Sequence, residues 1–219
     1  MVLRINMNLF IKMLPSLFKG SITTLKVFFV TLIISLPLSF ILAFINNRKN
    51  RIINSIFWAY IYVERGTPLL LQLMFIYFGL PYLGITLSRE IAIYTTFILN
   101  YSAYFIEILR GGIIAIDDGQ FKAAKVLGLS NSYTFLNITL PQCVRNSLPS
   151  IGNEVLNLVK DTSLITILGA SELLKAGRNA VNLYATATPF IFVAIFYLLM
   201  TFAITRVMNY LEKRSAYYE

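Results

Sequence analysis

Long apolar stretches recur along almost the whole of this 219-residue chain, and they restrict it to folds that a lipid bilayer can surround. Charged residues make up only 13% of the sequence, against roughly 25% in soluble domains. A membrane-spanning helix needs about 20 predominantly apolar residues, and five segments reach that length, at about residues 22–45, 52–80, 90–109, 147–168 and 185–207. We therefore expect an all-α integral membrane protein of about five transmembrane helices. No remaining block could hold a separate soluble core, so we expect one domain over residues 1–219.

The sequence lacks the residues on which many enzymes depend. It contains no histidine, which removes the usual general base and the commonest zinc ligand. Its one cysteine, Cys143, cannot form an intrachain disulfide and lies in no metal-ligand spacing. We interpret Cys143 as a small packing residue, and we expect neither a metal site nor a hydrolase site.

The basic residues bear on partners and on topology. The formal charge of +9 comes from Lys and Arg in small clusters between apolar runs, a pattern that argues against a nucleic-acid partner. With five spans, the clusters near residues 48–51, in residues 111–141 and in the C-terminal tail share one side, which the positive-inside rule makes cytoplasmic. The C terminus is then cytoplasmic and the N terminus is outside. Four basic residues fall on the outer side, against the rule: Arg4, Lys12, Lys19 and Lys26.

Two segments should depart from a simple span. Residues 7–18 carry Lys12 and Pro15 among apolar residues, and we expect a short amphipathic helix at the membrane surface. The segment 52–80 is too long for one straight helix, and the polar run Glu64–Pro68 interrupts its middle. We predict a kink or local unwinding there.

Residues 111–141 form the only long stretch without membrane-grade hydrophobicity, so they should lie outside the bilayer. The two aspartates at residues 117–118 suit the start of a helix, and Gly128 suits a left-handed stop. A second short helix can start at residues 130–131, and Pro141 should prevent its extension. We predict two short helices in this loop.

The same loop resembles a known family. Ala123 and Ala124 are followed after three residues by Gly128, and nine residues later by the pattern Ile-x-Leu-Pro that ends at Pro141. This arrangement resembles the cytoplasmic signature of permease subunits of ABC importers, although the family usually begins the motif with Glu where this chain has Lys122.

Further stretches narrow the resemblance to the polar amino-acid permeases, over roughly residues 16–212. These stretches are Arg65–Gln72, Glu107–Gly112 and Lys160–Leu164, followed by Glu172 and Leu173.

The resemblance implies a multi-pass permease of the bacterial cytoplasmic (inner) membrane, with several partners. It implies a dimer, expected as a homodimer with a second copy of this chain. Two ABC ATPase subunits would dock on the two 111–141 loops, and an extracytoplasmic binding protein would deliver the amino-acid substrate. The residues expected to contact the ATPase are Gly119, Gln120, Ala123, Ala124, Lys125, Leu127 and Gly128. The chain has no phosphate-binding loop, so we expect it to bind no cofactor and to be no enzyme, with ATP and Mg held by the ATPase partner.

Carboxylates inside the predicted spans are candidates for the substrate site. Each ionised group costs about 2.5 to 3.5 kcal/mol at the bilayer centre, so such groups rarely face lipid. Glu154 and Asp161 are seven residues apart and return to the same helix face, with Asn157 close to it. We interpret this stripe as the lining of the pathway, where it attracts the ammonium group and any basic side chain of an amino acid. Ion pairing inside the protein remains the alternative, for example between Glu107 and Arg110 one turn away.

Other candidates lie at the predicted break and on neighbouring spans. A half-helix end at Arg65 and Thr67 could receive the substrate carboxylate, or Pro68 could only kink the helix. Polar side chains elsewhere are as suited to bonding between helices as to substrate contact. The remaining substrate-binding candidates are Gln72, Asn100, Glu107 and Ser163.

Two other classes of function compete with an ATP-driven importer. An ion-coupled secondary transporter would use the same buried acids as ion sites, and a membrane enzyme would need a catalytic group that is not evident. The motif over residues 123–141 favours the importer, because an ion-coupled carrier needs no loop on which an ATPase docks.

Overall fold

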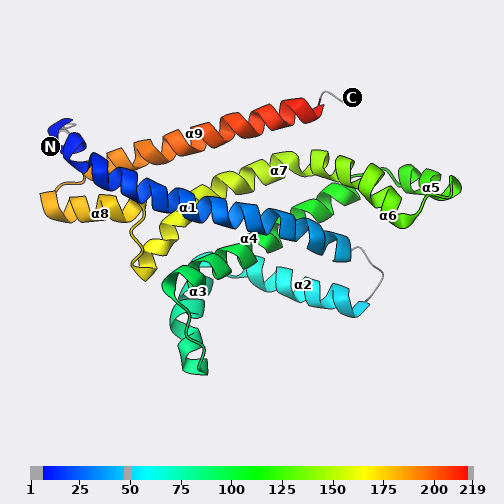
Figure 1. Cartoon of the computed structure of the whole chain (residues 1–219), viewed down its shortest axis with the longest axis horizontal. Helices are drawn as coiled ribbons and strands as arrows, with labels where there is room; N and C mark the ends of the chain where they lie inside the picture. Colours follow the sequence, from blue (N-terminus) through cyan, green and yellow to red (C-terminus); the bar gives the residue numbers. More distant parts are fainter. Residues whose placement is uncertain (1–6, 47–50, 217–219) are drawn as a thin grey trace.

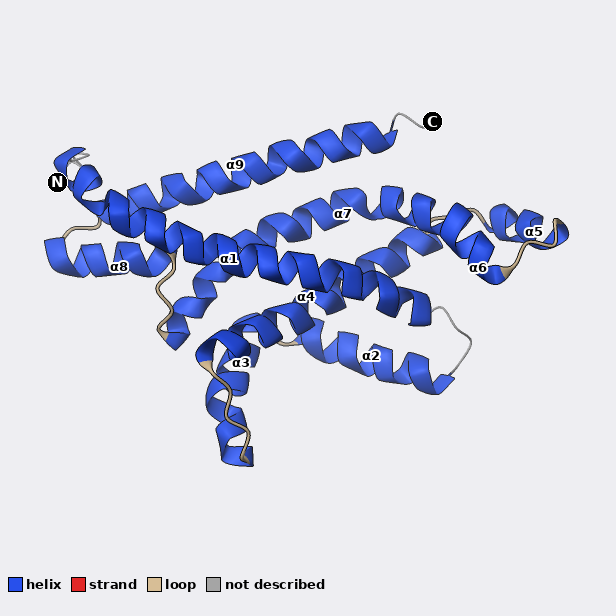
Figure 2. Ribbon diagram, viewed as in Figure 1, coloured by secondary structure: helices blue, strands red, loops and turns tan. Residues whose placement is uncertain are grey.

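The computed structural model of the protein describes residues 7–46 and 51–216. These residues form helices joined by turns, and no strand occurs among them, as Figures 1 and 2 show. The all-α prediction is confirmed for this part of the chain. Arg4, Arg48 and Lys49, which contributed to the expected topology, lie outside it.

Nine α-helices carry labels in Figure 1. They are α1 Met7–Asn46, α2 Arg51–Gly66, α3 Leu69–Met74, α4 Arg89–Ile114, α5 Asp118–Val126, α6 Asn131–Thr134, α7 Leu140–Asp161, α8 Leu173–Tyr184 and α9 Thr188–Ala216. Short irregular helical turns extend three of them: Phe75–Gly79 and Leu80–Leu83 follow α3, Phe135–Thr139 joins α6 to α7, and Thr162–Leu168 follows α7.

The long helices agree with about five membrane spans. Among the described residues, α1, α4 and α9 are each long and apolar enough to cross a bilayer. A fourth span is possible if α2 and residues 69–83 count as one, although the chain bends by 101° between them. The more polar α7 is shielded because it packs between α4 and α9.

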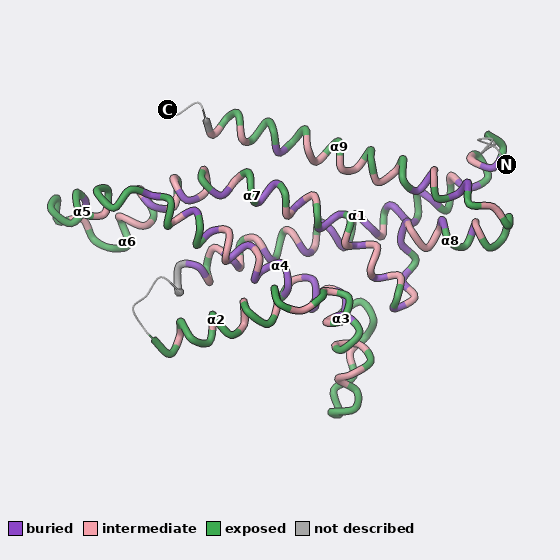
Figure 3. Tube along the Cα trace, turned by 180° about the vertical axis from the view of Figure 1, so that it is seen from behind, coloured by how far each residue is buried: buried purple, intermediate pink, exposed green. Residues whose placement is uncertain are grey.

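The bundle has two distinct ends (Figure 1). Helices α1, α4, α7 and α9 run along its length, α5 and α6 lie at one end, and α8 lies at the other beside the start of α1. The chain after α3 projects sideways. Large buried side chains of α4, among them Phe97 and Phe105, pack with Leu158 and Val159 of α7 to form the core. Figure 3 shows the buried segments concentrated in α1, α4 and α7, and the exposed ones in α2, α5 and α9.

The prediction of a surface helix over residues 7–18 is wrong. Met7–Asn46 is one helix of 40 residues, and one face of its first turns packs against the rest of the bundle. Leu9, Met13 and Leu17 are buried against side chains of α8 and α9. Their spacing of four residues puts them on one face, and that face meets α9 and the short helix α8, which the sequence had not indicated.

The residues between the last two predicted spans form the helix α8, which the sequence did not indicate. The buried carboxylate of Glu172 caps α8, because it accepts hydrogen bonds from the backbone N–H groups of Leu174 and Lys175, both at 2.6 Å. A close approach to α9 fixes the position of α8: a Cβ added at Gly177 would lie 2.4 Å from Val193.

The loop between α4 and α7 follows one prediction and contradicts another. Helix α5 begins after Asp117, whose side chain accepts a bond of 2.7 Å from the N–H of Gly119, and it is followed by Gly128 in the left-handed region at φ +69°. Pro141 was expected to end the next helix, but α6 continues through the π-helical turn Phe135–Thr139 into α7. Pro141 lies in the first turn of α7, where a missing N–H is tolerated.

Candidate functional site

A pocket of about 530 Å³ lies where two helices are interrupted. One interruption is the bend between α2 and α3, and the other is the end of α7, where the helix passes into a tighter 3-10 turn. The polar and aromatic residues that line the pocket are Arg65, Thr67, Asn100, Tyr101, Tyr104, Glu154, Asn157 and Asp161. Interrupted helices are a common way to build a substrate site at membrane depth.

Pro68 explains the first interruption and its hydrogen bonds. In an unbroken helix the carbonyl of Glu64 would accept from the N–H of residue 68, but proline has none. Two side-chain amides satisfy this carbonyl instead: Gln72 Nε2 and Asn100 Nδ2 each donate to it at 2.9 Å. Gln72 Nε2 also lies 2.8 Å from Thr67 Oγ1, and its Oε1 accepts from Asn100 at 3.0 Å.

These bonds show where two predicted candidates lie. Asn100 lines the pocket and braces the break, whereas Gln72 is not part of the lining. The sequence left open whether these amides bond between helices or contact substrate, and both of them bond to the broken segment.

The acids of the α7 stripe share one face of the helix, as their spacing predicted, and that face lines the pocket. Glu154, Asn157 and Asp161 all line it. Tyr101 donates a hydrogen bond of 2.7 Å to Asp161 Oδ2. Within residues 7–46 and 51–216, no Lys or Arg nitrogen lies within the 4.0 Å of a salt bridge from Glu154 or Asp161. The stripe is therefore not neutralised by an ion pair in this part of the chain.

Arg65 lies at the border between this pocket and a larger one of about 870 Å³. Its guanidinium is 3.6 Å from the carboxylate of Glu107 and 5.3 Å from the centre of the Tyr104 ring. Glu107 also binds Arg110, whose Nε and Nη2 donate at 2.8 and 2.5 Å. Glu107 thus lies in the larger pocket and has the intrahelical partner that the alternative interpretation proposed.

The remaining candidate, Ser163, is half-buried in the 3-10 turn and lines neither of these pockets. Sequence reasoning did not name Tyr101 and Tyr104, which also line the pocket. Their proximity to Asn100 on α4 was the only available signal. Across the described residues, no three His, Cys, Asp or Glu side chains are grouped so that they could hold a metal ion.

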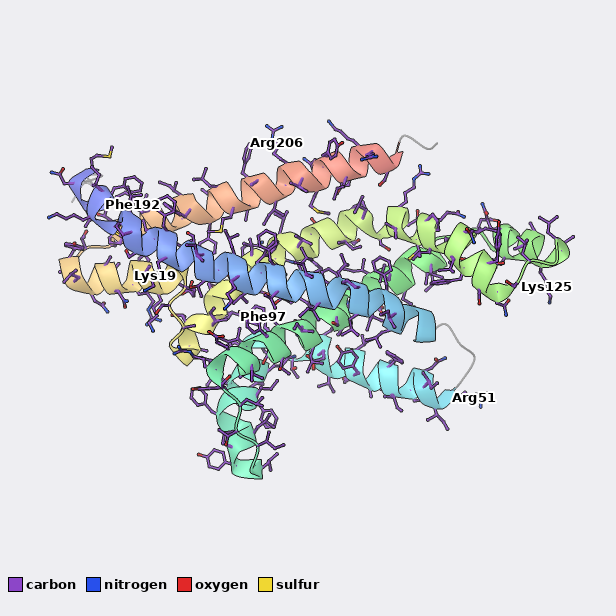
Figure 4. All side chains as sticks on the ribbon, viewed as in Figure 1. Lys19, Arg51, Phe97, Lys125, Phe192 and Arg206 are labelled. Carbon is purple, nitrogen blue, oxygen red and sulfur yellow. The ribbon has the colours of Figure 1, made fainter. Side chains whose placement is uncertain are left out.

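The predicted ATPase-coupling residues lie at the far end of the molecule from α8. Figure 4 shows Lys125 at this tip, well separated from Phe97 in the bundle. Leu127 is 74% exposed, and the other predicted contacts are exposed too, except Ala124, which is only 3% exposed. Ala124 is therefore covered by other residues of this chain.

Comparisons with known proteins agree with one another. A family model described as "Binding-protein-dependent transport system inner membrane component" matches residues 35–217. The chain is 35% identical over 209 residues to the putative glutamine transport system permease protein GlnP of Rickettsia conorii, covering 93% of this chain and 96% of that protein. It is 34% identical over 206 residues to the arginine transport system permease protein ArtQ of Bacillus subtilis, covering 93% and 94%. The crystal structure of an amino acid ABC transporter with histidines superposes with a TM-score of 0.88 at 30% identity, covering 98% of this chain and 100% of the other.

Proposed function

The chain belongs to the family of binding-protein-dependent transport system inner membrane components, and on this basis we propose that its pocket between α2, α4 and α7 binds a basic amino acid during import. The protein is a permease subunit of an ABC importer of amino acids, a multi-pass component of the inner membrane, and is not itself catalytic. An ion-coupled carrier is not favoured by its relatives.

The observation that carries the proposal is the charge of the pocket lining. Two carboxylates, Glu154 and Asp161, face the pocket, and one guanidinium, Arg65, lies at its border. A basic amino acid carries the reverse set, with two cationic groups and one carboxylate. Two opposite charges 4 Å apart attract by about 4 kcal/mol at an effective dielectric constant of 20. A neutral side chain would leave one carboxylate of the pocket without a partner.

The relatives support this class of substrate. The printed names of the permeases from R. conorii and B. subtilis refer to glutamine and arginine, and the matched crystal structure was obtained with histidines. All three amino acids have polar side chains, and arginine carries the two cations that the lining suits.

The connection between the pocket and the loop suggests how ATP drives transport. Helix α4 runs from the pocket to the loop that holds α5, and α7 returns from the loop to the pocket. Movement of α5 by a docked ATPase is therefore transmitted directly to Asn100 and Tyr101 on α4, and to the acids on α7. The expected result is alternating access, in which the pocket opens to one side of the membrane at a time.

The same proposal assigns the partners and the topology. Two ATPase subunits, which bind ATP and Mg, contact the tip around Val126 and Leu127, both strongly exposed. A second copy of the chain covers the segment after α3, which projects sideways and exposes Phe75, Phe78 and Tyr82. Helix α1 begins at the end opposite α5, and α9 runs from there toward the end that carries α5 (Figure 1), which supports an external N terminus and a cytoplasmic C terminus. A binding protein delivers substrate from outside.

The test is ATP-dependent uptake in proteoliposomes that contain the permease, its ATPase and its binding protein. Glu154→Gln and Asp161→Asn should each abolish uptake of labelled arginine, because each removes a charge from the lining. Glu212→Gln is the matched control, since this acid lies on α9 outside the pocket. Full arginine uptake by both pocket variants would reject the assignment of the site.

A further inference from the structure

A second polar cluster lies on the part of the bundle away from α5. Lys175 Nζ and Arg89 Nη1 converge on one backbone oxygen, that of Gly169, at 2.5 and 3.4 Å. A Cβ built on Gly169 would lie 3.7 Å from the Arg89 nitrogen and 3.8 Å from the Lys175 nitrogen, so both cations flank the same point. These side chains come from the first residue of α4 and from the first turn of α8.

A pocket of about 230 Å³ adjoins this point. Its lining includes Lys26 from α1, Arg89 and Glu90 from α4, and Ser171 from the turn before α8. Lys175 is not part of the lining, but its Nζ donates to the carbonyl oxygen of Gly169, to which Arg89 of the lining also donates. Lys26 and Arg89 are exposed, so the pocket is accessible in the single chain.

The cluster carries an excess of positive charge. Lys26, Arg89 and Lys175 contribute three positive charges, and two acids lie near them: Glu90 in the lining and the buried Glu172, which caps α8 beside Lys175. The cluster therefore keeps a net charge of +1. Among the residues that the structure describes, the only salt bridges join Glu107 to Arg65 and Arg110, so none of the three cations pairs with Glu90. Like charges held close together favour the binding of an anion that neutralises them.

The excess positive charge also indicates which kind of ligand suits this pocket. A basic amino acid has a net positive charge and would be repelled here, so this pocket does not suit the substrate of the central site. A carboxylate on an acidic protein surface has no such conflict. Complementary charge of this kind speeds docking and fixes its register.

We propose that Lys26, Arg89 and Lys175 form a carboxylate-binding site that receives an acidic side chain of the extracytoplasmic binding protein. The inference rests on the proposed function, which places this end of the bundle on the extracytoplasmic side of the membrane. It adds the surface on which the binding protein docks and the chemistry that the partner must present there.

The test uses the permease–ATPase complex in nanodiscs and the arginine-loaded binding protein that supports its uptake. The variant Arg89→Glu/Lys175→Glu should raise the Kd of the binding protein at least tenfold and remove most of its salt dependence. ATP hydrolysis without binding protein should stay at the wild-type rate. The control Lys12→Glu/Lys19→Glu changes the net charge equally on exposed positions of α1 outside the pocket, and it should keep the wild-type Kd.

Two further measurements keep the outcome decisive. The milder variant Lys26→Gln/Arg89→Gln should raise the Kd in the same direction, and a Lys substitution of one surface acid of the binding protein should restore affinity to the charge-reversed permease. An equal Kd for wild type and both pocket variants would overturn the inference. So would an effect that depends on phosphatidylglycerol in the nanodisc and not on the binding protein, since that result assigns the site to a lipid phosphate. Absence of ATP-driven uptake by the wild-type importer would instead defeat the proposed function itself.

Discussion

Replacing Gln72 by leucine separates its role in the helix break from a role in substrate binding. The substitution removes three well-formed hydrogen bonds, of 2.8 Å to Thr67 Oγ1, 2.9 Å to the carbonyl of Glu64 and 3.0 Å from Asn100. Hydrogen bonds between side chains inside membrane proteins average about 0.6 kcal/mol each, so the loss should be about 2 kcal/mol. The carbonyl of Glu64 keeps one donor, Asn100, and the fold should survive.

The assay is thermal unfolding of the purified permease together with arginine uptake. At roughly 2 to 4 °C per kcal/mol for a chain of this size, the Tm of Gln72→Leu should fall by about 4 to 8 °C. The KM for arginine should change by less than about threefold, because Gln72 does not line the pocket. The control Gln142→Leu removes an amide from the start of α7, where it bonds to Ile138, and it should lower the Tm by less. A KM raised tenfold at an unchanged Tm would refute the reasoning and make Gln72 a substrate ligand.

Three other predictions test separate parts of the structure. Gly177→Ala puts a methyl group 2.4 Å from a side chain of α9 and should destabilise the protein by about 1 to 3 kcal/mol, whereas Gly111→Ala, with nothing within 4 Å of its Cβ, should not lower the Tm. Leu127→Asp places a charge on the exposed tip and should abolish co-purification of the ATPase while the permease stays folded; retained co-purification would place the contact elsewhere. Tyr101→Phe removes the 2.7 Å bond to Asp161 and should lower the affinity for arginine about tenfold, or about 1.4 kcal/mol, because the carboxylate of Asp161 loses the donor that orients it in the pocket; an unchanged affinity measured by equilibrium binding would contradict this.

The sequence predicted those elements whose cause is local. The apolar runs predicted the spans, Pro68 predicted the break after α2, and Asp117 and Gly128 predicted the limits of α5. The helical spacing of Glu154 and Asp161 was sufficient to place both acids on the face that lines the pocket. Each of these features depends on residues that belong to one continuous segment of the chain.

Features that depend on distant partners were not predictable in this way. The first turns of α1 and the whole of α8 bury their apolar faces against each other and against α9, a pairing that no local pattern specifies. Pro68 indicated that the carbonyl of Glu64 would lose its helical donor, but not that Gln72 and Asn100 would replace it. Tyr101 joined the site only because folding brings α4 beside the end of α7.

Helix α7 lines the pocket and also connects it to the loop that holds α5 and α6. The carboxylates that face the pocket and the first residues after the coupling loop belong to one helix, Leu140–Asp161, although Pro149 lies within it. At about 1.5 Å per residue, a tilt of about 5° at its loop end would carry Asp161 through about 3 Å. A shift of that size separates a made hydrogen bond from a broken one. A small tilt of this one helix can therefore weaken the contacts of Asp161 with a bound substrate, and the other residues that line the pocket need not rearrange.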